Sequence, residues 1–189
     1  MVSLAVIGAS WGGMDAVGRL VGGLAADNRL AIAVAQHRSP DADGTLLRYL
    51  GKRSALPVVE ADDKAPIEPG CIYLAPPDYH LFVEHGSFAL STEGAVRFSR
   101  PSIDLLFESA ADAYGEGVVA VVLTGANDDG CRGVLAVKEA GGVTIAQDPA
   151  TAERPEMPEG AIGSGAVDLV LPIDGIARAL NDLGRGRAA

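Results

Sequence analysis

Short, continuously apolar segments recur along the chain, which is the pattern of parallel strands that are covered on both faces. They occupy residues 4–7, 30–35, 117–124, 143–146 and 167–171. Between them, apolar residues recur at helical spacing, which predicts helices over residues 14–24, 41–50 and 102–114 and in the segment that ends at Gly141. Strands that alternate with helices predict an α/β fold, with a doubly wound, mostly parallel sheet flanked by helices.

Residues 61–100 interrupt this alternation. Prolines and glycines there separate short strand-like runs, at residues 72–74, 81–84 and 88–90. The hairpin turn of this segment is expected at His85-Gly86-Ser87. We therefore predict a small antiparallel β insertion at about residues 61–100, within a single domain that covers residues 1–189.

Polar residues near the predicted helix ends give further expectations. Ser102 is the expected N-cap of the helix that follows it, because the apolar positions of that helix begin at Ile103. Asp104 and Glu108 lie outside the apolar stripe of the same helix, so both are expected to face water. Asp174 is expected to cap the last helix.

The composition narrows the classes of partner. The chain has 189 residues and a formal net charge of −10, whereas binding of nucleic acid or of an anionic membrane depends on clustered lysines and arginines. Cys71 and Cys131 are isolated, which indicates neither a zinc site nor a disulfide framework. Since we find neither a basic leader nor an apolar run of membrane-spanning length, we expect no signal peptide and no membrane insertion. A cytoplasmic location and a protein or small-molecule partner are therefore expected.

The segment around Gly8, Ser10 and Gly12 has two main interpretations. Its strand, glycine-rich turn and helix resemble a dinucleotide-binding fingerprint, but Ser10 stands where that fingerprint needs a glycine. The second strand also ends at Gln36-His37, without the acidic residue that would hold a ribose. The spacing Gly-x-Ser-x-Gly instead fits a nucleophile elbow, in which a serine hydroxyl is exposed at a strand end beside free N–H groups of the next helix. A phosphate loop or a packed turn is the alternative.

Ser10, His37 and Asp129 follow the ends of strongly apolar strands. Because sites in such sheets form at the carboxyl ends of the strands, these residues are a candidate nucleophile, base and orienting acid. The alternative is structural: His37 would be a hydrogen-bonded residue at a strand end, and Asp129 would cap the helix after it. The order Ser, His, Asp along the chain differs from that of the α/β-hydrolases, so that family is not supported.

A set of short motifs runs in order through nearly the whole chain. They are Ile7-Gly8-Ala9-Ser10 with Gly12-Gly13, Gln36-His37, Tyr73-Leu74-Ala75-Pro76 with His80, Arg100-Pro101-Ser102-Ile103-Asp104, Leu123-Thr124-Gly125 with Asp129-Gly130, Ala146-Gln147-Asp148, and Met157-Pro158 with Ala161-Ile162 and Gly165-Ala166-Val167. In these motifs the chain resembles the catalytic domain of the chemotaxis receptor methylesterases, the CheB-type protein-glutamate methylesterases. The resemblance implies that Ser10 is the nucleophile, His37 its base and Asp129 the acid that orients His37. It also implies action on methyl esters of receptor glutamates, often with deamidation of receptor glutamines.

The chain departs from the usual pattern of this family beside the candidate catalytic residues. Trp11 stands where threonine is usual, Ala126 where methionine is usual at a position associated with the oxyanion site, and Arg38-Ser39 where Met-Pro is common. With Gly12 and Met157, Trp11 and Ala126 are predicted to lie in the substrate and oxyanion vicinity. Because Trp11 adds a ring where Ala126 removes a side chain, the two are expected to compensate in volume. The receiver domain that usually precedes this domain is not expected, since the first strand begins close to the start of the sequence.

These observations leave hypotheses of function from different classes. The leading one is a serine hydrolase without cofactor or metal, in which Ser10, activated by neutral His37, attacks glutamate methyl esters of a methylated chemotaxis receptor or related signalling protein. The second is a regulatory or interaction module of the same fold whose site Trp11 and Ala126 have closed. The third is a nucleotide-binding domain, which the glycine turn favours and Ser10 disfavours. Formation of an acyl-enzyme distinguishes the first hypothesis from the second.

Overall fold

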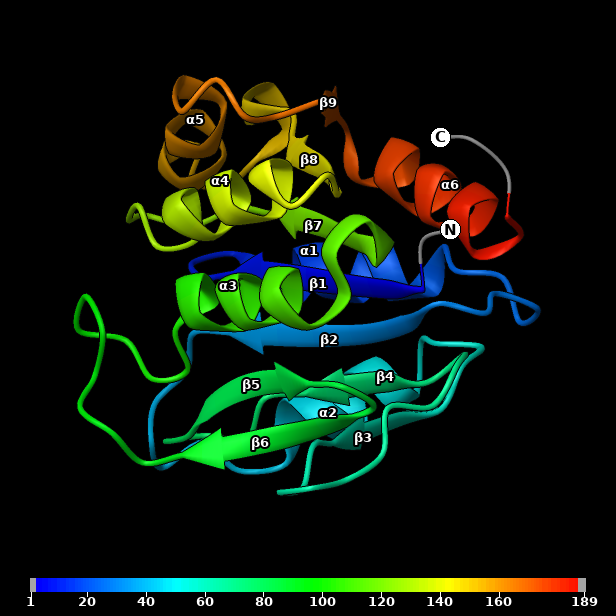
Figure 1. Cartoon of the computed structure of the whole chain (residues 1–189), viewed down its shortest axis with the longest axis vertical. Coiled ribbons are helices and arrows are strands. Elements are labelled where there is room, and N and C mark those ends of the chain that lie inside the picture. The colour runs from blue at the N-terminus through cyan, green and yellow to red at the C-terminus, as the bar shows by residue number, and fades with distance from the viewer. Residues whose placement is uncertain (1–2, 187–189) are drawn as a thin grey trace.

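The computed structural model describes residues 3–186, and within them seven strands form one sheet (Figure 1). The strands are β1 (Leu4–Ala9), β2 (Ala31–Gln36), β3 (Val58–Glu60), β4 (Ile72–Leu74), β7 (Val118–Val122), β8 (Val143–Gln147) and β9 (Leu169–Leu171). Their order across the sheet is β3-β4-β2-β1-β7-β8-β9, and the neighbouring strands are parallel. The predicted doubly wound, mostly parallel α/β fold is confirmed.

Helices cover both faces of this sheet (Figure 1). One face carries α1 (Gly13–Gly22), α2 (Thr45–Gly51) and α6 (Ile173–Gly184). The other carries α3 (Ile103–Tyr114), α4 (Cys131–Glu139), α5 (Glu156–Gly163) and the hairpin of β5 (His80–Glu84) and β6 (Ser87–Ser91). Short 3₁₀ helices, η1 (Gly115–Gly117) and η2 (Pro149–Thr151), lie in connections. Within residues 3–186, no helix has the length and apolar character needed to cross a membrane.

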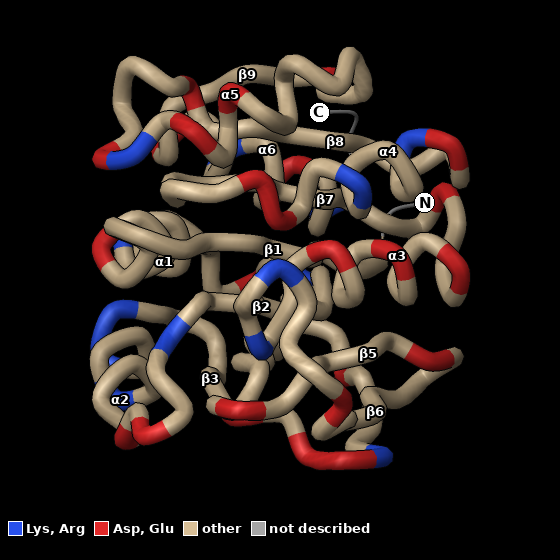
Figure 2. Tube along the Cα trace, turned by 90° about the vertical axis from the view of Figure 1, so that its left-hand side faces the viewer, with Lys and Arg blue, Asp and Glu red and all other residues tan. Residues whose placement is uncertain are grey.

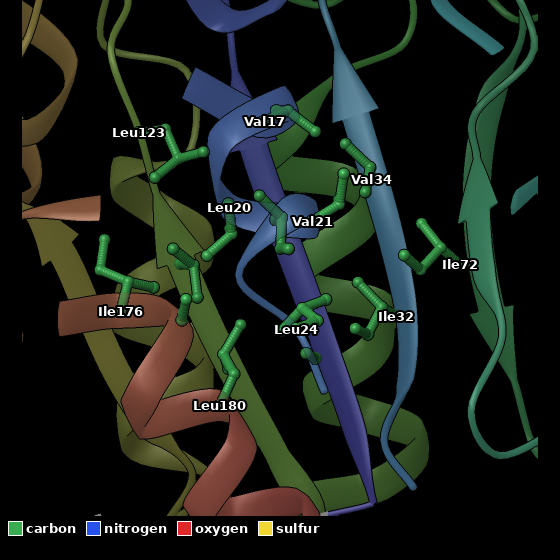
Figure 3. Packing of buried hydrophobic residues seen from close by; sticks show 14 of the residues in the cluster. Val17, Leu20, Val21, Leu24, Ile32, Val34, Ile72, Leu123, Ile176 and Leu180 are labelled. Atoms are coloured by element: carbon green, nitrogen blue, oxygen red, sulfur yellow. The ribbon is translucent and has the colours of Figure 1, made fainter. Parts of the chain in front are cut away.

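The central strand β1 shows why the strand sequences are apolar throughout. Its residues Ala5 and Ile7 pack with α1 and α6, whereas Leu4 and Val6 pack with α3 and α4. Figure 3 shows the first of these sides, where apolar side chains of α1 and α6 cover the sheet, among them Val17, Leu20, Val21, Ile176 and Leu180. Because every position of β1 is buried, the alternation of a half-exposed strand is absent.

The segment predicted as an antiparallel insertion divides between two sheets. Residues 72–74 form β4, which pairs with β2 and β3 in parallel, so their assignment to the antiparallel insertion is wrong. The strands β5 and β6 do pair with each other in antiparallel fashion, and the turn between them is His85-Gly86. A run of three apolar residues has too little periodicity to distinguish a buried parallel strand from a hairpin strand.

The helix ends agree only partly with the sequence analysis. Ser102 caps α3 as predicted, since its side chain accepts a hydrogen bond from the N–H of Leu105. Asp104 is fully buried, so its predicted exposure is wrong, whereas Glu108 is partly exposed. The predicted cap by Asp174 is also wrong, because α6 begins at Ile173 without a side-chain cap. Asp174 lies in the first turn, where a carboxylate still interacts favourably with the helix dipole.

Candidate active site

The carboxyl ends of β2, β1 and β7 lie side by side at one edge of the sheet, because these strands are neighbours in it. Strand order runs from β1 through β2 in one direction and through β7 in the other, so this edge is a topological switch point, where α/β proteins place ligand sites. Ser10 directly follows β1, His37 directly follows β2, and Asp129 lies in the loop between β7 and α4. The structure thus brings the predicted residues to one place.

His37 contacts both of the other residues. Its Nδ1 lies 3.1 Å from Ser10 Oγ, and its Nε2 lies 2.8 Å from Asp129 Oδ2. Since an ionised carboxylate only accepts hydrogen bonds, Nε2 carries the ring proton and Nδ1 presents its lone pair to the serine hydroxyl. Nδ1 is therefore the atom placed to take the proton of Ser10, whereas the usual serine-protease template uses Nε2.

Asp129 is buried at the start of α3. Besides His37, its carboxylate accepts hydrogen bonds from the N–H of Ile103 at 2.8 Å, the N–H of Asp104 at 2.9 Å and the hydroxyl of Ser102 at 3.1 Å. Burial acts to raise the pKa of this carboxyl, but the hydrogen bonds from His37 and from the α3 backbone outweigh burial and lower the pKa below its ordinary value. Asp129 is therefore ionised at neutral pH, and it fixes the orientation and the tautomer of His37.

The ends of neighbouring strands fix the backbone around Ser10. The N–H of Ser10 donates to the carbonyl of Thr124 at 2.9 Å. Gln36 Nε2 donates to the carbonyl of Ser10 at 2.8 Å and to that of His37 at 3.0 Å. Gln36 lies so close to α1 that a Cβ on Gly13 would be 2.0 Å from its Oε1, so only glycine fits there. The sequence analysis used Gln36 only as evidence against a ribose site and missed this positioning role.

Unpaired N–H groups lie next to Ser10. Within residues 3–186, no hydrogen bond uses the backbone N–H of Trp11, Gly12 or Ala126. Gly12, at φ 76°, immediately precedes α1, where the first N–H groups of a helix have no partner inside it. A Cβ on Gly125 would lie 2.9 Å from Ser10 Cβ, so the loop that contains Ala126 contacts the nucleophile. These N–H groups are available to an oxyanion that forms at Ser10.

The other predicted residues of this vicinity divide between core and surface. Met157 is buried, and a Cβ on Gly125 would lie 1.9 Å from its Sδ. Trp11 is 64% exposed and its Nε1–H donates to Glu153 at 3.0 Å, while Ala126 is also exposed. The expected compensation in volume between Trp11 and Ala126 is therefore wrong, because neither side chain occupies a buried space. Trp11 forms an exposed aromatic rim beside Ser10.

Asp104 connects α3 to the loop of Asp129 in the reverse direction. Its Oδ1 accepts hydrogen bonds from the N–H groups of Gly130 and Gly133, both at 2.9 Å, at the start of α4. Asp129 thus caps α3 while Asp104 caps α4, which explains a buried carboxylate that the helical pattern alone could not predict. Burial raises the pKa of Asp104, and the nearby charge of Asp129 adds to this effect.

Two replacements of Asp104 separate its hydrogen bonds from its charge. Asp104→Ala leaves the buried N–H groups of Gly130 and Gly133 without an acceptor, so it is expected to lower the free energy of unfolding by about 2 to 4 kcal/mol. It should also lower kcat, because the loop of Asp129 loses its anchor. Asp104→Asn retains an acceptor and is expected to stay within about 1 kcal/mol of the wild type. Denaturant unfolding measures both variants, and equal losses would contradict the capping role.

The pH dependence of the Asp104→Asn variant is a second check. A raised pKa in the folded state means that ionised Asp104 destabilises the fold at neutral pH, and that this effect disappears as the pH falls through the raised value. Asparagine lacks the effect at every pH. The free energy of unfolding of Asp104→Asn minus that of the wild type should therefore decrease as the pH is lowered from neutral toward about 4, the ordinary aspartate pKa.

His80 supports the same group from the hairpin. It is fully buried, its Nδ1 accepts a hydrogen bond from the N–H of Ser102 at 3.1 Å, and its Nε2 donates to the carbonyl of Gly94 at 3.1 Å. The hydroxyl of Ser102 in turn donates to Asp129. His80 is a positioning residue, two hydrogen bonds removed from the carboxylate of Asp129.

The thiol of Cys131 lies near the site without being a second nucleophile. Cys131 is the first residue of α4 and is partly buried. Burial, together with the charges of Asp104 and Asp128, raises the pKa of the Cys131 thiol to about 11. Since the thiolate is the reactive form of cysteine, Cys131 is unreactive at neutral pH.

A cavity of about 430 Å³ lies beside His37. Its walls include Arg38, Ser99, Arg100 and the fully exposed Phe98. Figure 2, which looks onto this edge of the sheet, shows basic positions close to the label of β2 and acidic positions on the elements around them. The volume is in the range of about 300 to 1,000 Å³ that is usual for ligand sites, so a substrate side chain can be accommodated next to the base.

This geometry decides among the classes that the sequence left open. A nucleotide-binding domain needs a glycine at the position of Ser10, and a module with a closed site is not favoured, because His37 borders an open cavity. Ser10, His37 and Asp129 are instead arranged for nucleophilic attack on a carbonyl. The molecule is a serine hydrolase built on a doubly wound α/β sheet.

More particularly, the chain belongs to the CheB methylesterase family, whose model matches residues 5–180. It is 42% identical over 173 residues to "Putative protein-glutamate methylesterase/protein-glutamine glutaminase" of Leptospira interrogans, which covers 91% of this chain and 90% of that protein. It is also 42% identical to "Protein-glutamate methylesterase/protein-glutamine glutaminase 2" of Anaeromyxobacter dehalogenans, covering 97% of this chain and 54% of that protein. The crystal structure of the Thermotoga maritima CheB methylesterase catalytic domain matches with a TM-score of 0.92 at 34% identity, over 97% of this chain and 99% of that one. The resemblance inferred from the motifs is confirmed.

Proposed function

We propose that this protein hydrolyses methyl esters of glutamate side chains in chemotaxis receptors or related signalling proteins, and that it also deamidates glutamine side chains. The observation that carries the proposal is the line of hydrogen bonds from Ser10 through His37 to Asp129. The relatives support the choice of substrate, since their names combine methylesterase and glutaminase. A methylated receptor as partner and a cytoplasmic location are parts of the same proposal.

In the acylation half of the reaction, Ser10 Oγ attacks the ester carbonyl carbon while its proton passes to His37 Nδ1. Asp129 stabilises the imidazolium through the hydrogen bond that it accepts from Nε2. The unpaired N–H groups next to Ser10 bind the oxyanion of the tetrahedral intermediate. The bond to the methoxy group then breaks, methanol takes the proton from Nδ1, and an acyl ester remains on Ser10.

Deacylation repeats these steps with water as the nucleophile. Water gives a proton to His37 Nδ1 and attacks the acyl carbon, and the proton returns to Oγ as the bond to Ser10 breaks. The products are a glutamate side chain and the free enzyme. When the substrate is a glutamine side chain, ammonia leaves in place of methanol. All proton transfers in this scheme use groups of the chain itself.

Capture of the acyl-enzyme tests the chemistry, and methanol release tests the substrate. After the protein is mixed with p-nitrophenyl acetate and quenched in acid, mass spectrometry should find one acetyl group on the peptide that contains Ser10. A methylated receptor fragment should release methanol, whereas the unmethylated fragment should not. If the folded protein gives neither an acetylated Ser10 nor methanol, the regulatory module becomes the better interpretation.

A further inference from the structure

Arg38 directly follows the base His37 and is almost completely buried, with 9% of its side chain exposed. Its Nη2 donates to Glu60 Oε1 at 2.9 Å and to the carbonyl of Ala75 at 2.6 Å. Within residues 3–186, the buried atoms Nε and Nη1 of the same guanidinium have no hydrogen-bond partner. A charged group beside the catalytic base therefore has donors that the chain does not satisfy.

Such donors are uncommon in folded proteins. Most buried polar groups have a partner, and arginine keeps its positive charge in proteins, so unused N–H groups on it are costly. The N–H groups of a guanidinium form a planar fork that matches the two oxygens of a carboxylate. The missing acceptor at Arg38 is best supplied by a carboxylate that comes from outside the chain.

The cavity of about 430 Å³ provides the space for that group, because both His37 and Arg38 line it. Arg100 lines it too, but the guanidinium of Arg100 already donates to Asp78 and to the carbonyls of Thr92 and Glu93. The same contact neutralises Asp78, the carboxylate in the wall of the cavity. The donors that remain for a ligand are therefore those of Arg38.

We propose that Arg38 forms a carboxylate subsite in this cavity, which binds an acidic side chain of the substrate segment close to the esterified glutamate. The inference rests on the proposed function, since it assigns a specificity-determining residue to that reaction. A purely structural role for Arg38, in which it joins β3 to the end of β4, uses Nη2 alone. That role gives no preference for acidic substrates, so the two roles differ in a measurable way.

A peptide series tests the subsite. Each peptide carries one methyl-esterified glutamate and one glutamate at a successive position on either side of it, and is compared with the same peptide carrying glutamine there. With the wild-type protein, glutamate should raise kcat/KM about 10- to 100-fold at one or more positions, mainly through KM, as expected for a hydrogen bond between charged groups. Equal kcat/KM for glutamate and glutamine at every position overturns the proposal.

Variants assign any preference to Arg38. Arg38→Met has a similar length without donors and should lose the preference for glutamate. Arg38→Lys keeps the charge but lacks the fork, so it should lose most of the preference while it can still pair with Glu60. The matched control is Arg19→Met, since Arg19 is half-exposed at the end of α1 and pairs with Asp174. It makes the same change of net charge and should keep the preference, so a preference that survives in Arg38→Met and Arg38→Lys overturns the proposal.

A further measurement does not depend on how well the variants fold. Glutarate should inhibit the wild-type protein competitively, and it should inhibit Arg38→Met at least about tenfold more weakly. Hydrolysis of p-nitrophenyl acetate, which has no carboxylate, should be similar in the wild type, Arg38→Met and Arg19→Met. Failure of the wild type on this small ester contradicts the proposed function, whereas hydrolysis of it without any effect of carboxylates contradicts the subsite alone.

Discussion

Replacing Ser10 with alanine is expected to lower kcat for ester hydrolysis by a factor on the order of 10⁴ or more. The variant lacks the oxygen that forms the acyl-enzyme. The hydrogen bonds that hold residue 10, from its N–H to Thr124 and from Gln36 to its carbonyl, involve the backbone and remain. The melting temperature should therefore change little, so that a loss of turnover measured with p-nitrophenyl acetate reports on chemistry rather than on unfolding.

Ser99 supplies a matched control, because its Oγ lies 3.4 Å from the same Nδ1 of His37. It precedes Arg100 in a loop and is not followed by the start of a helix. Ser99→Ala is expected to keep kcat within about tenfold of the wild type, since the bond it removes is long. A loss as large as that of Ser10→Ala would identify the wrong serine as nucleophile. The double variant Ser10→Ala/His37→Ala should be no slower than Ser10→Ala alone, because the members of a triad act as a unit.

Gly8→Ala is expected to lower the free energy of unfolding by about 1 to 3 kcal/mol and to lower kcat as well. Gly8 lies in β1, where an added Cβ would be 2.3 Å from Cγ2 of Ile103. Ile103 is fully buried at the start of α3, so the crowding has to move that helix or the strand. Because the N–H of Ile103 donates to Asp129, the displacement reaches the triad. Denaturant unfolding and ester turnover measure the two effects.

Gly163→Ala is the control for this substitution. Gly163 is the last residue of α5, and nothing lies within 4 Å of an added Cβ there. Alanine has the higher helix propensity, so the control should be as stable as the wild type or more stable by up to about 1 kcal/mol. If Gly8→Ala behaves like Gly163→Ala, then β1 and α3 do not approach each other as closely as the structure has them.

The residues of the triad could be predicted from sequence because each follows a long apolar strand. Burial on both faces makes β1, β2 and β7 continuous apolar runs, and such runs mark the strands at the centre of a parallel sheet. The polar residue after each run then has to lie at the same edge. Ser10, His37 and Asp129 were found in this way, before the motifs added the assignment of their roles.

The positioning residues could not be predicted in this way. Asp104 bonds with backbone groups of Gly130 and Gly133, and Gln36 bonds with the carbonyl of Ser10. Helical periodicity describes which face of α3 is apolar, but it carries no information about unpaired N–H groups at the start of another helix. A polar residue in a short motif beside a strand end was the available signal for Gln36, and the motif Ser102-Ile103-Asp104 was the signal for Asp104.

Short strands were the other source of error. Residues 72–74 are apolar like β1, but three residues are compatible with either a parallel strand or a hairpin strand. Their pairing with β2 is decided by partners far along the chain, such as Ile32 opposite Ile72. The prolines at 66, 69, 76 and 77 correctly indicated broken structure around the strand, and wrongly suggested that the strand itself belonged to the hairpin.

The central place of β1 has a consequence for how often the site opens. The amide hydrogens of β1 are bonded between parallel neighbours on both sides, and such hydrogens exchange with deuterium only when much of a molecule unfolds. The turn at Arg97 and Phe98, with positive φ at both residues and a fully exposed ring, belongs instead to the fast-exchanging class. The nucleophile is thus attached to the slowest-exchanging strand, while one wall of the cavity beside it opens and closes many times before that strand does.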